Sequence, residues 1–256
     1  MRLVYTENVH TLHLPPGHRF PIGKYGALVE RVGRRHADLL LLGARASLED
    51  LALVHHRSYL DAFLAGTLSE PSVRRLGFPW SETLVARSVR SVGGTLAALS
   101  WAMHGGAAGH LAGGTHHAFA DRGEGFCALN DLAVAIAVAR RDYGVRRAAV
   151  VDLDVHQGNG TASLFASDPD VFTCSLHGER NYPFRKARSS LDVGLPDGCD
   201  DATYLRALDA ALEQVHAFRP ELLLYQAGVD ILAGDRLGRM AVSLAGLAAR
   251  DARVYG

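Results

Sequence analysis

Aspartate and histidine side chains follow two short apolar segments of the chain. Residues 152–160 read DLDVHQGNG after the first segment, and residues 227–235 read AGVDILAGD after the second. Side chains two residues apart on an extended strand point the same way, so Asp154 and His156 can converge on one point. Asp230, at the end of a nearby strand, can supply a third ligand. Two carboxylates and one imidazole with an open fourth position indicate a catalytic metal site.

Each of these residues taken alone also fits a structural role, as an aspartate that caps a helix or a buried, hydrogen-bonded histidine. The metal interpretation is favoured by the three residues together and by the glycines that crowd both strand ends. The same ligand set would also accept Fe²⁺ or Co²⁺, so the residue types do not by themselves select zinc.

The adjacent histidines His116 and His117 form a second feature, directly after a pair of glycines that allow close backbone approach. The pair could be incidental or another metal pair, and spacing alone supports a catalytic pair about as well as these two alternatives together. A catalytic role requires a neutral imidazole that a neighbouring acceptor orients. Asp152 and Asn159 are the available acceptors near the metal strand.

A parallel sheet is the element that must position these residues. Unbroken apolar runs lie at 148–151, 171–176 and 222–225, and a helical pattern at about 202–217 separates the last two. Such strands between helices predict an α/β fold, with a mostly parallel sheet covered by helices on both faces. Sites in open α/β sheets lie at the carboxyl ends of the strands, where these residues are found. Further helical patterns lie at about 24–36, 48–65, 82–104 and 130–142.

Composition bounds the class of protein. The chain has 256 residues, with 27 basic and 27 acidic side chains, and no linker or repeat divides it, so we expect a single domain over residues 1–256. The neutral balance argues against nucleic acid or an anionic membrane surface as the main partner. No apolar run approaches the ~18 residues of a spanning helix. Three scattered cysteines and the absence of a secretory signal predict a cytoplasmic protein.

Longer motifs surround the candidate residues: GTHH at 114–117, GFCALND at 125–131, DLDVHQGNG at 152–160 and AGVD at 227–230. In this order they resemble the zinc-dependent histone deacetylase family, which includes bacterial deacetylases and acetylpolyamine amidohydrolases and has the arginase-like α/β fold. The segment SLHGERNYPF at 175–184 most resembles the class IV branch and its bacterial relatives. The similarity spans nearly the whole chain.

The resemblance implies one zinc ion per chain, held by Asp154, His156 and Asp230. It implies that His117 is the general base toward the attacking water and then the acid toward the leaving amine. His116 would be mainly an electrostatic partner, held by Asp152.

The resemblance also implies a substrate tunnel and a second ion. Phe126 and Tyr182 would wall a narrow apolar tunnel, with the backbone of Gly125 near the substrate nitrogen, although both aromatic rings also fit ordinary packing. A structural potassium ion would lie behind the zinc. Its ligands would be the Asp152 side chain, the Ser175 hydroxyl and the carbonyls of Asp154, His156 and Leu176.

Two positions depart from the family pattern. Asn159 stands where many members have an aspartate that orients the second histidine, so we expect His117 to be a weaker base, although class IV relatives share the asparagine.

Family members also continue past the last helix into another strand and a Gly-Gly-Tyr loop, whose tyrosine donates a hydrogen bond to the oxyanion. We therefore expect a C-terminally incomplete domain that lacks this strand. Tyr255 lies in the helical stretch and is not equated with that tyrosine. Loss of one oxyanion donor typically costs ~10²–10³ in rate.

The leading hypothesis is a metal-dependent amide hydrolase that removes acetyl or longer acyl groups from lysine in a peptide or protein, from a polyamine or from a similar small amine. One alternative is a catalytically impaired scaffold that binds acyl-lysine without the oxyanion tyrosine. Another is an arginase-like ureohydrolase, which needs two manganese ions and further carboxylates. Position 158 is glycine and position 232 is leucine where those carboxylates would stand, so a single metal is favoured.

Overall fold

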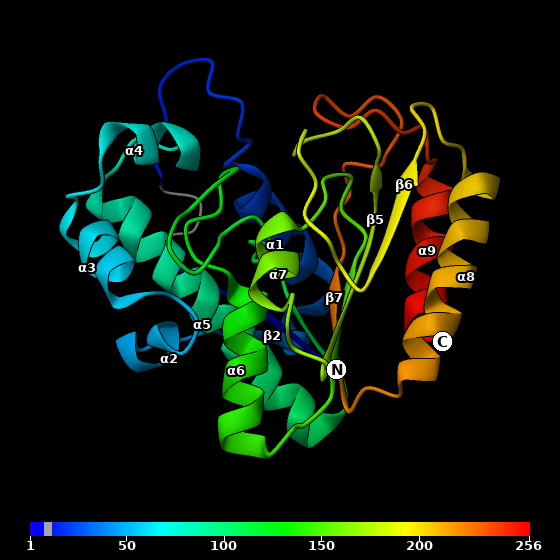
Figure 1. The fold of residues 1–256 in the computed structure, drawn as a ribbon, viewed down its shortest axis with the longest axis horizontal. Helices are drawn as coiled ribbons and strands as arrows, with labels where there is room; N and C mark the ends of the chain where they lie inside the picture. The colour runs from blue at the N-terminus through cyan, green and yellow to red at the C-terminus, as the bar shows by residue number, and fades with distance from the viewer. Residues whose placement is uncertain (8–11) are drawn as a thin grey trace. The chain divides into compact units, whose positions relative to one another are not determined.

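The computed structural model of the chain describes residues 1–7 and 12–256 (Figure 1). These residues form two compact units, Met1–Gly144 and Val145–Gly256. Each unit is built around its own sheet, with three strands in the first and four in the second. Every strand pairing within the two sheets is parallel, and helices flank the strands. The predicted α/β fold with parallel strands is confirmed, and its strands are divided between two sheets.

The sheet of the first unit is short, in the order β2–β1–β3. Its strands are β1 (Arg2–Tyr5), β2 (Leu40–Leu42) and β3 (Ala108–His110). The long helix α5 (Glu82–Gly105) packs against β1 and β3. The other helices of this unit are α1 (Lys24–His36), the 3₁₀ helix η1 (Ala37–Leu39), α2 (Leu48–Ala52), α3 (Arg57–Ala65), α4 (Glu70–Leu76) and α6 (Asp131–Tyr143).

Two adjacent glycines let α5 approach its neighbours closely. A Cβ atom at Gly93 would overlap the backbone of residues 44–46, and one at Gly94 would overlap the imidazole of His110. The helix begins at a serine cap, because the side chain of Ser81 accepts a hydrogen bond from the N–H of Leu84. The close approach at Gly94 places α5 directly beside β3, the strand that carries His110.

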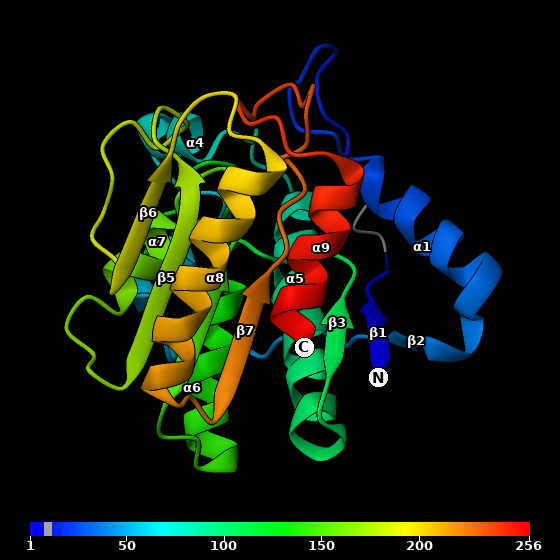
Figure 2. The same ribbon diagram turned by 90° about the vertical axis from the view of Figure 1, so that its right-hand side faces the viewer.

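The sheet of the second unit has the order β6–β5–β4–β7. Its strands are β4 (Ala148–Asp152), β5 (Val171–Gly178), β6 (Leu191–Leu195) and β7 (Leu222–Gln226). All five residues of β4 are buried, which agrees with its unbroken apolar sequence. Helix α8 (Asp201–Phe218) packs on β5 and β6 and contacts α9 (Leu244–Tyr255), and Figure 2 shows α8 lying across the face of this sheet with α9 beside it. The short helix α7 (Asn159–Leu164) follows β4.

One predicted helix differs from the structure. The pattern at 48–65 forms two helices, α2 and α3, with a break between them. In this break the N–H of His56 donates to the carbonyl of Ala120, and Nδ1 of His55 lies 2.9 Å from the carbonyl oxygen of Phe119. Contacts with a distant loop therefore replace the hydrogen bonds of a continuous helix.

A search of the described residues finds no helix that is both long enough and apolar enough to cross a membrane.

The glycine contacts predict opposite effects for two Gly→Ala substitutions in helices. Gly93→Ala should destabilise the protein by about 1–3 kcal/mol, because its methyl group meets backbone atoms rather than flexible side chains. Gly33→Ala in α1 should stabilise it by up to about 1 kcal/mol, because the added Cβ makes only an ordinary 3.5 Å contact with Leu40. Urea unfolding of the two variants measures both values. Equal changes in the two would contradict the close contact at Gly93.

Candidate metal centre

The parallel register of the second unit brings the candidate ligands to one edge of its sheet. β4 lies between β5 and β7, with Asp152 opposite Ser175 on one side and Gln226 on the other. The loops that follow β4 and β7 therefore leave the sheet side by side. These loops carry the predicted ligands, Asp154 and His156 after β4 and Asp230 after β7.

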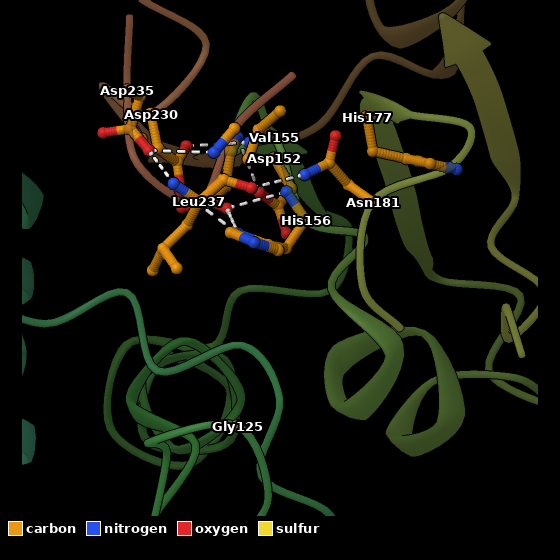
Figure 3. Close-up of polar contacts among 12 residues, drawn as sticks. Gly125, Asp152, Val155, His156, His177, Asn181, Asp230, Asp235 and Leu237 are labelled. Atoms are coloured by element: carbon orange, nitrogen blue, oxygen red, sulfur yellow. Dashed lines mark hydrogen bonds and ion pairs between the residues drawn. The ribbon is translucent and has the colours of Figure 1, made fainter. Parts of the chain in front are cut away.

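The three side chains come together at the strand ends. One ligand atom from each of Asp154, His156 and Asp230 lies within 4.8 Å of the other two. Nδ1 of His156 lies 2.9 Å from Oδ1 of Asp154 and 3.1 Å from Oδ2 of Asp230. Figure 3 shows Asp230, Val155 and His156 within one close group of residues at this edge of the sheet. Asp154, His156 and Asp230 form the one such group of histidine, cysteine, aspartate and glutamate side chains among the residues described.

Backbone amides hold the two carboxylates in place. The N–H of Val155 donates to Oδ1 of Asp230 at 2.9 Å, and the N–H of His156 donates to Oδ1 of Asp154 at 2.8 Å. Glycine at position 228 allows the two loops to approach, because a Cβ there would lie 2.5 Å from both Cα and Oδ2 of Asp154. Each carboxylate thus has one fixed orientation before any ion binds.

The negative charges of Asp154 and Asp230 favour a positive charge between them. Burial raises the pKa of Asp230, and the neighbouring charge of Asp154 raises it further. Burial by itself lowers the pKa of His156, but the hydrogen bonds that its imidazole donates to both carboxylates, together with their negative charges, outweigh this effect and raise the pKa to about 10. Two carboxylates therefore converge on a nitrogen that they hold protonated, and a divalent ion can replace that proton. The donor set fits zinc, which binds imidazole nitrogen and carboxylate oxygen.

A buried arginine supports the loop that carries Asp230. Arg250, on α9, is 1% exposed, and its Nη1 donates to the carbonyl of Gly228, two residues before Asp230. Its Nε donates to Oδ1 of Asp251 at 2.8 Å, and the hydroxyl of Tyr225 donates to the same carboxylate oxygen. Arg250 was not among the residues predicted from the sequence. Its position on the apolar face of α9, with Gly246 and Leu247, is the sequence feature that could have indicated it.

Aromatic side chains lie beside the candidate metal centre within the second unit. The ring of Tyr182 packs edge-on at 6.4 Å from the ring of His156, and Phe184 packs edge-on against Tyr182. Phe184 is 84% exposed. Tyr182 therefore has the location expected of a residue that lines the approach to His156, and its role in a tunnel stays a prediction.

The other predicted tunnel residues belong to the first unit. Both Gly125 and Phe126 have left-handed backbone conformations, with φ of 56° and 66°. The N–H groups of the two residues donate to the carbonyls of Arg75 and Leu76, at the end of α4. The Phe126 ring packs in an aromatic cluster with His18, Phe20 and Phe78. Ordinary packing, one of the two interpretations of Phe126 from sequence, is thus present, and its contact with substrate stays a prediction.

The predicted catalytic histidines are buried in the first unit. The rings of His116 and His117 have centroids 4.1 Å apart and are inclined by 46°. Asp152 and Asn159 are buried in the second unit, at the end of β4 and the start of α7. The pairing of these acceptors with the two histidines stays a prediction.

Donors for the predicted potassium ion lie on paired strands. Asp152 and Ser175 are register partners in β4 and β5, and both are buried. The hydroxyl of Ser175 also lies 3.0 Å from Nδ1 of the buried His177, which the sequence analysis did not single out. Burial lowers the pKa of His177 to about 4, so this imidazole is neutral near pH 7. The ion itself stays a prediction.

Comparison with known proteins places this arrangement in a family. A model of the histone deacetylase domain matches residues 18–256, across both units. The chain is 45% identical to an uncharacterized protein of Picosynechococcus over 93% of its own length and 81% of that protein. It is 35% identical to histone deacetylase 2 of Arabidopsis thaliana over 93% of its length and 65% of that enzyme.

A solved structure agrees with these matches. The crystal structure of a histone deacetylase homologue complexed with SAHA superimposes with a TM-score of 0.85 and 26% identity. The match covers 99% of this chain and 75% of that one. The chain thus spans about two thirds to four fifths of the length of these relatives, and it belongs to the histone deacetylase family.

Proposed function

We propose that this protein is a zinc-dependent deacylase, which hydrolyses the amide bond between an acetyl or longer acyl group and the side-chain nitrogen of lysine or a similar primary amine. The observation that carries the proposal is the convergence of Asp154, His156 and Asp230 at the strand ends of a histone deacetylase domain. The relatives include a histone deacetylase by name. A cytoplasmic location and a structural potassium ion remain parts of the same proposal.

Asp154, His156 and Asp230 would hold the zinc. When bound, zinc would polarise the substrate carbonyl and lower the pKa of the attacking water toward ~7. The N–H groups of Val155 and His156 keep the two carboxylates oriented toward the ion, so binding needs little rearrangement of the loops. Among the described residues the group has three protein ligands, fewer than the bridged metal pair of an arginase-like enzyme needs, which supports a single metal.

His117 would accept the proton of the attacking water as the water oxygen bonds to the carbonyl carbon. It would then give a proton to the nitrogen as the C–N bond breaks, which releases the free amine and the carboxylic acid. His116 would act on the same charge through space, since its ring lies 4.1 Å from that of His117. Asn159 would accept an imidazole N–H without adding negative charge, which makes His117 a weaker base than a carboxylate partner would.

The test is to measure metal content and amine release on the purified chain, with an acetyl-lysine peptide and a long-chain acyl-lysine peptide. We expect one divalent ion per chain and turnover that a chelator abolishes. Asp154→Ala and Asp230→Ala should lose the metal and the turnover together. Asp209→Ala, in an exposed ion pair with Arg253, is the control and should retain both.

Two results would contradict this function. Full zinc occupancy in Asp154→Ala and Asp230→Ala would overturn the ligand assignment. Bound metal without turnover on either peptide would instead favour the scaffold that binds acyl-lysine.

Substitution of His117 separates proton transfer from metal binding. His117→Ala should keep the metal content of the wild type and lose about 10²–10⁴-fold in kcat, the usual contribution of a general acid–base residue. Metal analysis and steady-state kinetics on the same preparation check this. Wild-type kcat would remove His117 from the catalytic role.

Substitution of Arg250 tests the support of the Asp230 loop. Arg250→Met removes a fully buried guanidinium and leaves the carbonyl of Gly228 without its donor, so we expect a loss of about 1–3 kcal/mol in the free energy of unfolding. Zinc affinity should fall about 10–100-fold as Asp230 loses its fixed position. Chelator competition and urea unfolding measure the two effects. Arg253→Met, on the same helix but in an exposed ion pair, should change stability by less than about 1 kcal/mol. Equal losses in both variants would argue against the role of Arg250.

A further inference from the structure

The first residue of α6 is a fully buried carboxylate that the helix does not need as a cap. Asn130 is the N-cap, and its Oδ1 accepts a hydrogen bond from the N–H of Ala133 at 3.0 Å. The side chain of Asp131 is therefore free of capping and points to another part of the chain, although both residues are good capping types by sequence. Its position in the first turn lets the helix dipole stabilise its negative charge.

The Asp131 carboxylate accepts four hydrogen bonds. Oδ1 accepts from the N–H and the hydroxyl of Thr115, each at 2.7 Å. Oδ2 accepts from the N–H of Gly114 at 3.0 Å and from the hydroxyl of Thr95 at 2.6 Å. The N–H of Asp131 in turn donates to the Thr115 hydroxyl at 3.2 Å. Two of the four donors are thus the consecutive backbone amides that directly precede His116.

These hydrogen bonds hold the glycine-containing segment 113–115 in one backbone conformation. Gly113 and Gly114 both have left-handed conformations, with φ of 82° and 70°. Glycine has the largest range of backbone conformations, so holding two in sequence costs entropy that the carboxylate bonds offset. A Cβ at Gly113 would lie 2.5 Å from Oδ2 of Asp131, so the glycine also makes room for the carboxylate.

A second chain of hydrogen bonds ends on the same carboxylate. The Thr95 hydroxyl lies 2.6 Å from Oδ2 of Asp131 but 3.5 Å from the carbonyl oxygen of Ser91, so its hydrogen goes to the carboxylate. The hydroxyl oxygen is then an acceptor for Nδ1–H of His110, 3.0 Å away. Nε2 of His110 is buried without a hydrogen-bond partner, which fits the tautomer that carries its hydrogen on Nδ1. The carboxylate is thereby tied to both α5 and β3.

We propose that Asp131 is a positioning residue for the two histidines. Its carboxylate clamps the backbone of Gly114 and Thr115, so that His116 and His117 leave a fixed segment and present their rings in one orientation. The clamp follows from contacts within the first unit alone. Its catalytic consequence rests on the proposed function of His117.

Asp131→Asn tests the clamp with almost no change in size. The amide has one acceptor oxygen, and its NH₂ group faces donors that the second carboxylate oxygen used to satisfy. We expect kcat on the acetyl-lysine peptide to fall about 10–100-fold, because misplacement of a catalytic group by about 1 Å has such effects. KM should stay within about twofold and metal content should stay at the wild-type value, and the pH–rate profile should shift. NMR spectra of histidine-labelled protein should show displaced signals for His116 and His117.

Two controls separate positioning from stability. Leu84→Ala creates a cavity in the buried face of α5, about three helical turns before Thr95, and should lower Tm without changing kcat at temperatures well below Tm. Thr115→Ser keeps the hydroxyl that donates to Asp131, whereas Thr115→Val removes it. We expect the serine variant to retain most of the activity that the valine variant loses. The valine variant combined with Asp131→Asn should lose less than the product of the two fold-changes, because both break the same network.

The outcomes distinguish the clamp from the proposed function. If the wild type is active and Asp131→Asn leaves kcat, the pH–rate profile and the histidine spectrum unchanged, the positioning role of Asp131 is overturned. The deacylase proposal then still stands. A wild type without turnover would overturn the deacylase proposal, and the histidine spectra alone would then decide the clamp. If Asp131→Asn does not fold, the Thr115 pair decides, and equal activities of its serine and valine variants would contradict the clamp.

Discussion

Two carboxylates that approach the same imidazole nitrogen are the constraint on which the second unit depends. Asp154 and Asp230 both reach Nδ1 of His156, at 2.9 and 3.1 Å, in a place where burial and mutual repulsion oppose two negative charges. Such an arrangement persists only when a cation offsets the repulsion. With no metal the imidazolium of His156 supplies that charge, because its hydrogen bonds to the two carboxylates and their negative charges raise its pKa to about 10. The proposed zinc ion would offset the same repulsion with two charges.

Neutral backbone donors and one cation that does not touch the ligands stabilise the two neighbouring carboxylates and the loops that carry them. The N–H groups of Val155 and His156 stabilise the carboxylates without competing for the ion. Arg250 is fully buried, yet it donates to the carbonyl of Gly228 and to Asp251 rather than to a candidate ligand. A guanidinium bound directly to Asp230 would take the place of the metal. Bound instead to the carbonyl of Gly228, two residues before Asp230, the guanidinium holds the loop and leaves the carboxylate available.

The strand ends were predictable from the sequence because they depend on short-range rules. An unbroken apolar run followed by Asp154 and His156 fixes both the strand and the direction of its side chains, and parallel pairing brings Asp230 alongside. The first unit's sheet was not predicted, since strands of three or four residues carry no usable period. Arg250 and Asp131 were also missed in their roles, because each acts through backbone carbonyls or amides of a distant loop. No spacing in the sequence encodes a partner of that kind.

Carboxylates in both units hold backbone segments in place, whether or not an ion binds to them. Asp230 accepts the N–H of Val155, Asp154 accepts that of His156, and Asp131 accepts those of Gly114 and Thr115. A glycine clears the space for two of these carboxylates, Gly228 for Asp154 in the second unit and Gly113 for Asp131 in the first. The absence of a side chain at these two positions is therefore explained by the carboxylates that face them. Replacing either partner would disturb the geometry of the site even though neither a glycine nor Asp131 reacts.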